Sequence, residues 1–143
     1  MERIPVIRTR NLSIGYVLKG GHLKLVHDAL DLNLYPGEVT CLLGLNGAGK
    51  STTMNIICGV LNQTEGEVYI NGISLSEHPV EAKQNIGFLP QKPPLYGDLN
   101  VDEYLTYCAN LRLMDEKQVK TAVEEAKRRC GIAHFSHRLI RNL

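Results

Sequence analysis

The stretch Gly44-Leu-Asn-Gly-Ala-Gly-Lys-Ser-Thr52 decides how the rest of this chain is interpreted. It contains the pattern G-x-x-x-x-G-K-[ST] and an additional glycine at position 47. Glycines in such a loop allow a tight turn that points backbone N–H groups inward without obstruction by Cβ atoms. A helix predicted to begin near Lys50 directs its electropositive N-terminus at the same place, so the pattern predicts a cradle for an anion.

Side chains add to this cradle. Lys50 supplies a full positive charge for the β and γ phosphates of a nucleotide, and the Ser51 hydroxyl is suited to ligate Mg²⁺. Thr52 is expected to hydrogen-bond near the α-phosphate, and the backbone contacts are expected from Gly44, Leu45, Asn46, Gly47, Ala48 and Gly49. The alternative is an ordinary glycine turn before a helix. The full pattern favours a nucleotide-binding loop, because so many specified positions rarely coincide by chance.

The surroundings of the loop fit an α/β unit. Residues 39–43 form a short apolar run, which predicts a strand buried on both faces of a parallel sheet. A helix is expected from Lys50 to Cys58, with Gly59 ending it. Two earlier strands, within Ile4–Ile14 and Leu23–Leu34, are predicted to pair as a hairpin through a turn at Lys19-Gly-Gly-His22.

Further strands are predicted downstream of the loop. The strand Gly66–Ile70 is followed by Asn71-Gly72, a strong hairpin-turn signal, and by the partner strand Ile73–Leu75. Residues 86–89 are apolar and predict another buried strand, which Pro90 ends.

The last third of the chain has a helical period. Asn100 and Glu103 form a capping-box pattern, and the apolar face of the helix after Asn100 is predicted to hold Val101, Leu105, Cys108 and Leu111. A second helix is predicted from near Asp115 to Gly131, with an apolar stripe of Val119, Ala122, Val123, Ala126 and Cys130.

Composition excludes several classes of protein. The 143 residues carry a formal net charge of +1, which favours neither nucleic acid nor an anionic membrane. No apolar run approaches the ~20 residues that would span a bilayer, and the N-terminus lacks the plan of a secretion signal. The four cysteines show no metal-binding spacing, so we expect them to be reduced residues in the core of a cytosolic protein.

The motifs together resemble the ATP-binding cassette (ABC) transporter ATPases. The resemblance rests on the loop at 44–52, the Pro36-Gly-Glu38 turn ahead of it, and Ile86-Gly-Phe-Leu-Pro-Gln91, and it extends over essentially the whole chain. It implies that ATP and Mg²⁺ are the cofactors. It also implies that Gln91 is the Q-loop glutamine, reaching the metal and the attacking water, and that Tyr16 is the aromatic residue that stacks on adenine.

The resemblance also implies a fold. We expect an α/β P-loop NTPase core with an antiparallel β-subdomain over residues 1–99, through the Q-loop, and the start of a helical subdomain over 100–143. The stretch Leu95–Leu105 looks most similar to cassettes of ABC-2 exporters. Arg141-Asn-Leu143 resembles the approach to the family's signature loop, and neither that loop, a Walker B strand nor a switch histidine is found. We therefore expect a truncated, N-terminal portion of a cassette, which binds nucleotide weakly and hydrolyses it negligibly.

The implied function is that of an ATP-binding subunit which couples ATP binding and hydrolysis to transport. Lys50 and Gln91 would then be catalytic, and Ser51 and Gln91 would contact the metal. The implied partners are a second cassette and a membrane permease docking at Lys92–Tyr96, on the cytoplasmic face of the membrane, with no nucleic acid. The alternatives are a soluble ABC-type ATPase of translation or DNA repair, or another P-loop kinase or GTPase. A GTPase should carry an Asn-Lys-x-Asp motif, which this sequence lacks.

Overall fold

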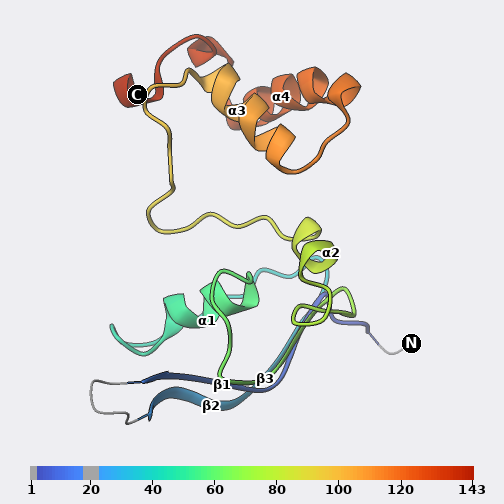
Figure 1. Cartoon of the computed structure of the whole chain (residues 1–143), viewed down its shortest axis with the longest axis vertical. Helices are drawn as coiled ribbons and strands as arrows, with labels where there is room; N and C mark the ends of the chain where they lie inside the picture. Colours follow the sequence, from blue (N-terminus) through green and yellow to red (C-terminus); the bar gives the residue numbers. More distant parts are fainter. Residues whose placement is uncertain (1–2, 18–22) are drawn as a thin grey trace. The chain divides into compact units, whose positions relative to one another are not determined.

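An antiparallel sheet organises the first part of the chain (Figure 1). The structure is a computed structural model that describes residues 3–17 and 23–143. The strands are β1 (Ile7–Val17), β2 (Leu23–Leu34), β3 (Glu65–Ile70) and β4 (Ile73–Ser74), in the spatial order β2-β1-β3-β4. The chain divides into two compact units, residues 1–88 and 89–143, and the sheet belongs to the first.

The predicted hairpin is confirmed by the antiparallel pairing of β1 with β2, although its turn lies outside the described residues. Register shifts interrupt the pairing, and Asn11 and Ala29 have positive φ angles of 47° and 49°. Side chains take up backbone groups at these irregularities. The amide of Asn11 donates to Asp31 Oδ1 at 2.7 Å, and that of Ala29 donates to Ser13 Oγ at 3.2 Å. The bulges are therefore stabilised by polar partners, which replace the ladder hydrogen bonds lost there.

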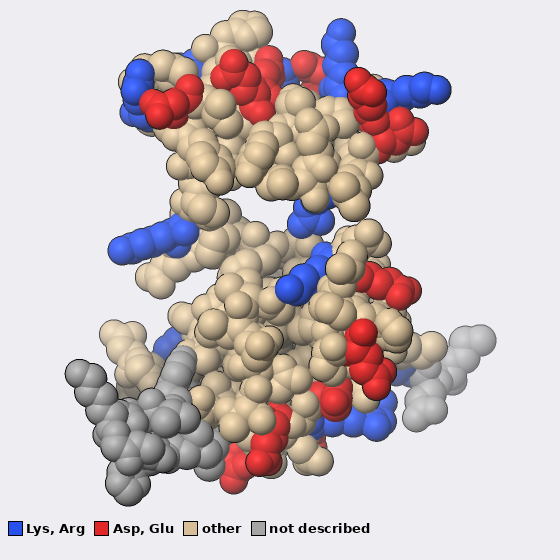
Figure 2. Space-filling view, in the orientation of Figure 1, with Lys and Arg blue, Asp and Glu red and all other residues tan. Residues whose placement is uncertain are grey.

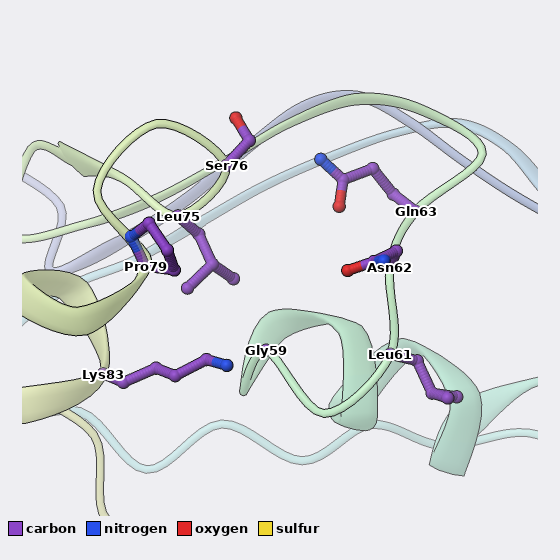
Figure 3. Close-up of a pocket in the computed structure, with 8 residues that line it drawn as sticks. All are labelled: Gly59, Leu61, Asn62, Gln63, Leu75, Ser76, Pro79 and Lys83. Carbon is purple, nitrogen blue, oxygen red and sulfur yellow. The ribbon is translucent and has the colours of Figure 1, made fainter.

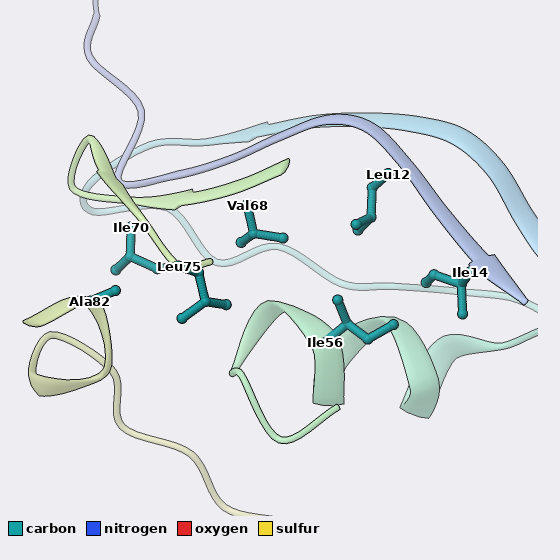
Figure 4. Close-up of a cluster of buried hydrophobic side chains, with 7 residues drawn as sticks. All are labelled: Leu12, Ile14, Ile56, Val68, Ile70, Leu75 and Ala82. Carbon is teal, nitrogen blue, oxygen red and sulfur yellow. The ribbon is translucent and has the colours of Figure 1, made fainter. Parts of the chain in front are cut away.

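Two helices complete this unit, namely α1 (Lys50–Ile57) and α2 (Pro79–Gln84). Figure 4 shows α1 facing the side chains of β1 and β3. The buried cluster that joins them consists of Leu12, Ile14, Ile56, Val68, Ile70, Leu75 and Ala82. The helix α1 was predicted, whereas α2 was not, although Pro79 at its first turn and Glu81 after it are ordinary signals of a helix start.

Two of the predicted buried strands are not strands in this structure. Residues 39–43 have no assigned secondary structure, and Val39 and Leu43 are 96% and 88% exposed. Residues 86–89 are likewise unassigned, with Ile86 packed against the core and Leu89 exposed. A strand requires a neighbour to satisfy its backbone groups, and neither segment finds one among the described residues.

The second unit is helical. It contains α3 (Val101–Leu111), α4 (Glu116–Cys130) and two 3₁₀ turns, η1 (Ala133–Phe135) and η2 (Ile140–Asn142). The predicted capping box is present, because Asn100 Oδ1 accepts from the Glu103 amide and Glu103 accepts from the Asn100 amide. Gly131 ends α4 in the left-handed conformation, as predicted.

The apolar faces of these helices differ partly from the prediction. The buried cluster consists of Ala109, Val119 and Val123, with Leu105 packed against it. Leu111 is 64% exposed and Cys130 is exposed, so both were wrongly placed on buried faces. Ala109 is the buried residue that α3 contributes to this cluster, and it was not among the residues predicted for the apolar face.

The structure tests what the composition predicted about the cysteines, the surface charge and membrane-spanning segments. All four cysteines are free, but Cys41 and Cys130 are exposed and Cys58 and Cys108 half-buried, so the prediction that they lie in the core was wrong. Figure 2 shows acidic and basic side chains interspersed on the visible face. Within the described ranges, no helix has both the length and the hydropathy needed to cross a bilayer.

A test of the sheet compares two glycines with left-handed backbones. Gly66 has φ +86°, and a Cβ there would overlap the carbonyl oxygen of Asn11, whereas Gly72 has φ +81° and open space around it. We expect Gly72→Ala to cost about 1–2 kcal/mol of unfolding free energy from the backbone alone. Gly66→Ala should cost about 1–3 kcal/mol more, because β1 and β3 must separate. Urea unfolding of both variants measures this difference, and equal losses would show that the close approach does not matter.

Candidate functional site

The loop at residues 44–49 leads directly into α1 and is open to solvent. Gly47 and Gly49 have φ angles of 82° and 81°, and Gly49 is the N-cap of α1. Gly44 differs, since its φ is not positive and a Cβ there would make only ordinary contacts with Ala48 and Lys50, at 3.4–3.8 Å. The Ala48 amide donates to the Leu45 carbonyl at 3.1 Å, which closes the turn. The positive φ values support the predicted backbone role of two of the three glycines.

Lys50 folds back across the beginning of the loop. Its ammonium donates to the carbonyl oxygens of Gly44 and Leu45, both at 2.7 Å. No acidic residue occupies the first turn of α1, so the positive end of that helix is not neutralised by its own side chains. The ammonium, the loop amides and the helix N-terminus therefore lie together on one short segment, and this donor set suits a polyphosphate.

The helix holds the loop through its buried face. Thr53 is fully buried, and both its amide and its hydroxyl donate to the Gly49 carbonyl, at 2.8 and 3.0 Å. One turn later, Ile56 is 1% exposed and belongs to the buried cluster under the sheet. The sequence motif did not assign Thr53 to the site. Its position three residues after Lys50, on the inner face of α1, was the available signal.

The other predicted site residues are distributed over both units. Ser51 is exposed and Thr52 half-buried in the first turn of α1, next to Lys50. Tyr16 lies in β1, paired in register with Lys24, but its side chain is outside what the structure describes. Gln91 is exposed and belongs to the second unit, residues 89–143. The structure thus groups the residues 44–52 and leaves the roles of Tyr16 and Gln91 as predictions.

A hollow of about 310 Å³ lies at the other end of α1 (Figure 3). Its lining residues are Gly59, Leu61, Asn62, Gln63, Leu75, Ser76, Pro79 and Lys83. The side chain of Lys83 extends over Gly59, where a Cβ would lie 2.5 Å from its Cε atom. A cation at this end of α1 complements the helix dipole, so we interpret Lys83 as stabilising the helix that carries the loop.

The segment predicted to meet a partner, Lys92–Tyr96, is exposed in the second unit. The Tyr96 ring contacts those of Tyr104 and Tyr107, with centroids 6.3 and 5.5 Å apart, and the Tyr104 hydroxyl donates to the Pro94 carbonyl at 3.4 Å. Burial, followed by interaction with Cys108, raises the pKa of Tyr104. A hydrogen bond with Tyr96, followed by burial, raises the pKa of Tyr107. The phenols form one aromatic patch beside an exposed proline-rich segment.

Comparison with known proteins gives consistent results. The family model described as "ABC transporter" matches residues 27–143. The phospholipid-transporting ATPase ABCA3 of Homo sapiens is 36% identical over 124 residues, which are 87% of this chain and 7% of that protein. The ABC transporter ced-7 of Caenorhabditis elegans is 41% identical over 93 residues, which are 65% of this chain and 6% of that protein. The chain thus spans only about a fifteenth of the length of these curated relatives.

Solved structures share the fold. The dimeric structure of MJ0796, a bacterial ABC transporter cassette, has a TM-score of 0.81 at 25% identity, over 96% of this chain and 62% of that one. The same cassette in a post-hydrolysis state, bound to ADP and Pi, has a TM-score of 0.80. An ATP-binding subunit of an ABC transporter gives 0.78 at 27% identity, over 94% of this chain and 54% of that one. The predicted P-loop NTPase fold of the ABC ATPase type is therefore confirmed.

The aromatic patch makes a prediction for alkaline titration. Because the pKa of Tyr104 and of Tyr107 is raised above the ordinary value of 10.0, both phenols keep their protons longer in the folded chain than in the unfolded chain. Their stabilising effect is present below that value and is lost as the pH rises through the folded pKa values. Tyrosinate absorbance should therefore develop at higher pH in the native chain than in urea. Tyr107→Phe should remove one late-titrating group, and superimposable native and denatured titrations would contradict the prediction.

Proposed function

Because the chain belongs to the ABC transporter family, we propose that residues 44–52 bind the polyphosphate of ATP with Mg²⁺, as the ATP-binding part of a transport ATPase. The observation that carries this proposal is the convergence of the Lys50 ammonium, the turn at Gly47 and Gly49, and the unneutralised N-terminus of α1. The solved relative that holds ADP and Pi supports the same ligand class.

Each residue of the loop then has a distinct task. Lys50 would exchange its two carbonyl partners for phosphate oxygens, which bind an ammonium more strongly because they are charged. The amides of residues 45–49 would donate to the bridging phosphates. The Ser51 hydroxyl would hold Mg²⁺, which neutralises charge on the β and γ phosphates when it is bound. Thr52 would lie near the α-phosphate.

Two residues outside the loop belong to the proposal. Gln91 would offer a neutral carboxamide oxygen to the metal and the attacking water, and its exposed position leaves it able to move. Tyr16 would stack on adenine, an interaction worth on the order of 1–3 kcal/mol in nucleic-acid binders. Both assignments rest on the family resemblance and on their positions before and after the loop.

The wider assembly is proposed from the family as well. We propose that two cassettes close on ATP, as the dimeric relative suggests, and that hydrolysis drives transport. The cassette would lie on the cytoplasmic side of the membrane and contact the permease through Lys92–Tyr96. Leu95 and Tyr96 in this segment are 54% and 53% exposed. An exposed apolar pair next to a proline pair is suited to bind a partner, because its burial releases water at little conformational cost.

The first test removes the charge at position 50. Lys50→Met should weaken Mg-ATP binding by about 2–5 kcal/mol, roughly 30- to 5,000-fold in Kd, because a charged partner of the phosphates is lost. Isothermal titration calorimetry measures this change. Lys120→Met is the matched control, because it removes an exposed lysine of α4, which belongs to neither the loop nor α1, and should leave Kd within about threefold. Wild-type affinity in the Lys50→Met chain would refute the assignment.

The second test concerns the metal. Ser51→Ala should leave the affinity for metal-free ATP nearly unchanged, because the hydroxyl is proposed to act through Mg²⁺. In the presence of Mg²⁺, its affinity should fall roughly 10- to 150-fold, the effect of losing a contact to a charged group worth about 1.5–3 kcal/mol. Titrations with and without Mg²⁺ separate the two states. An equal loss in both would assign Ser51 to the phosphates rather than to the metal.

A further inference from the structure

Two segments of the second unit that are far apart in the sequence lie side by side and are joined by hydrogen bonds. Residues 97–102 come shortly after Gln91 in the sequence, and residues 136–141 approach Leu143. The Ile140 amide donates to the Leu99 carbonyl at 2.9 Å, the Arg141 amide to Gly97 at 3.2 Å, and the Asp102 amide to Ser136 at 3.1 Å. Asn100 and Leu139 form an antiparallel bridge. We call this pair of segments the strap.

Lys127 of α4 lies at one end of the strap. Its side chain is only 3% exposed, and its ammonium donates to Asp102 Oδ1 at 2.6 Å, Glu124 Oε1 at 2.7 Å and Ser136 Oγ at 2.9 Å. An ammonium has three N–H groups, so all of them are used. The Ser136 hydroxyl donates its own proton to the Ala133 carbonyl at 2.7 Å. One buried cation thus joins residues from both segments of the strap to α4.

The two carboxylates are opposite in charge to this cation. Interactions with Asp102 and then Glu124 raise the pKa of Lys127, so it remains charged at any physiological pH. At the other end of the strap, Arg141 and Asp98 pair at 2.8 Å, but both side chains are largely exposed, and such pairs contribute little. The strength of the strap is therefore concentrated at Lys127.

Lys127 joins α4 to Asp102 in the first turn of α3, but the helix pair also has apolar contacts that do not involve this cation. These contacts come from Ala109 of α3 and from Val119 and Val123 of α4, which precede Lys127 by two turns and one turn. Lys127 could therefore be replaced without removing the packing between the helices. This separates a role in positioning the strap from a role in folding the unit.

We propose that Lys127 is a positioning residue that holds residues 136–141 against residues 97–102, so that the two segments move as one piece. The role of this piece in transport rests on the proposed function, in which Gln91 contacts the metal of the bound nucleotide. A displacement of Gln91 on nucleotide binding would then move the segment that follows it. The strap would then pass a displacement that begins near Gln91 directly to Arg141–Leu143. The strap itself can be tested without any nucleotide.

The first arm measures amide hydrogen exchange in the nucleotide-free chain. Lys127→Met replaces the ammonium with a neutral side chain of similar length, and should speed exchange at Asp102, Ile140 and Arg141 by about tenfold or more through local opening. The amides in the middle of α4 should be unaffected. Lys120→Met is the matched control, an exposed lysine two turns earlier on α4, and should change neither set. Unchanged strap amides, or equal loss of protection throughout α3 and α4, would overturn the proposal.

A double-mutant cycle identifies the partner. If Lys127 acts through Asp102, then Asp102→Asn combined with Lys127→Met should accelerate strap exchange no more than Lys127→Met alone, because both changes remove one interaction. Additive effects would mean that the two residues act separately, against the proposal.

The second arm adds Mg-ATP. In the wild-type chain, nucleotide should slow exchange in the strap, whereas in Lys127→Met it should slow exchange near Gln91 but not at Ile140 and Arg141. Slowing at both places in the variant would overturn the coupling. A wild-type chain that binds no nucleotide would refute the proposed function, and the nucleotide-free arm would still decide whether Lys127 holds the strap.

Discussion

The packing of α1 against β1 and β3 is the constraint on which the candidate site depends. The loop at 44–49 is exposed and has no core of its own, so its shape is set by the helix into which it leads. Ile56 fixes that helix in the buried cluster, and Thr53 ties the Gly49 carbonyl to the same face. Ahead of the loop, residues 39–43 pair with no strand among the described residues, which leaves the bonds from Lys50 to Gly44 and Leu45 to close the loop on that side.

The second unit uses a different principle. Its apolar cluster is small, and a buried cation joins the segments that the cluster does not reach. A buried ammonium is costly to desolvate and is tolerated only when its partners are charged and its donors are satisfied. That requirement is met here, since all three donors of Lys127 find acceptors.

Local signals predicted much of this structure. The loop, the start and end of α1, the capping box at Asn100 and the end of α4 at Gly131 are each determined within a few residues, so the sequence shows them directly. Residues 39–43 and 86–89 show the limit of such signals. Their apolar composition is typical of buried strands, but strand formation depends on a neighbour that composition does not identify. The predictions that Leu111 and Cys130 are buried were wrong for a related reason. A helical period identifies the apolar face of a helix, but it does not show how far along the helix the packing partner extends.

The residues that the sequence did not reveal, Lys127 and Thr53, are polar and act by hydrogen bonds of the folded chain. Lys127 lies among charged residues on α4, where a lysine is ordinarily solvated, but in the fold it is buried and bonded to Asp102 of α3 and to Ser136. Thr53 comes directly after a motif that already accounts for Ser51 and Thr52. Its hydrogen bond to the Gly49 carbonyl was therefore not predicted from the sequence. For Lys127 the side chain has no local signature, because Asp102 and Ser136 are brought to it only when the unit folds. Recognition motifs thus mark where a ligand is bound, while the groups that keep those motifs in place are recognised from the hydrogen bonds of the folded chain.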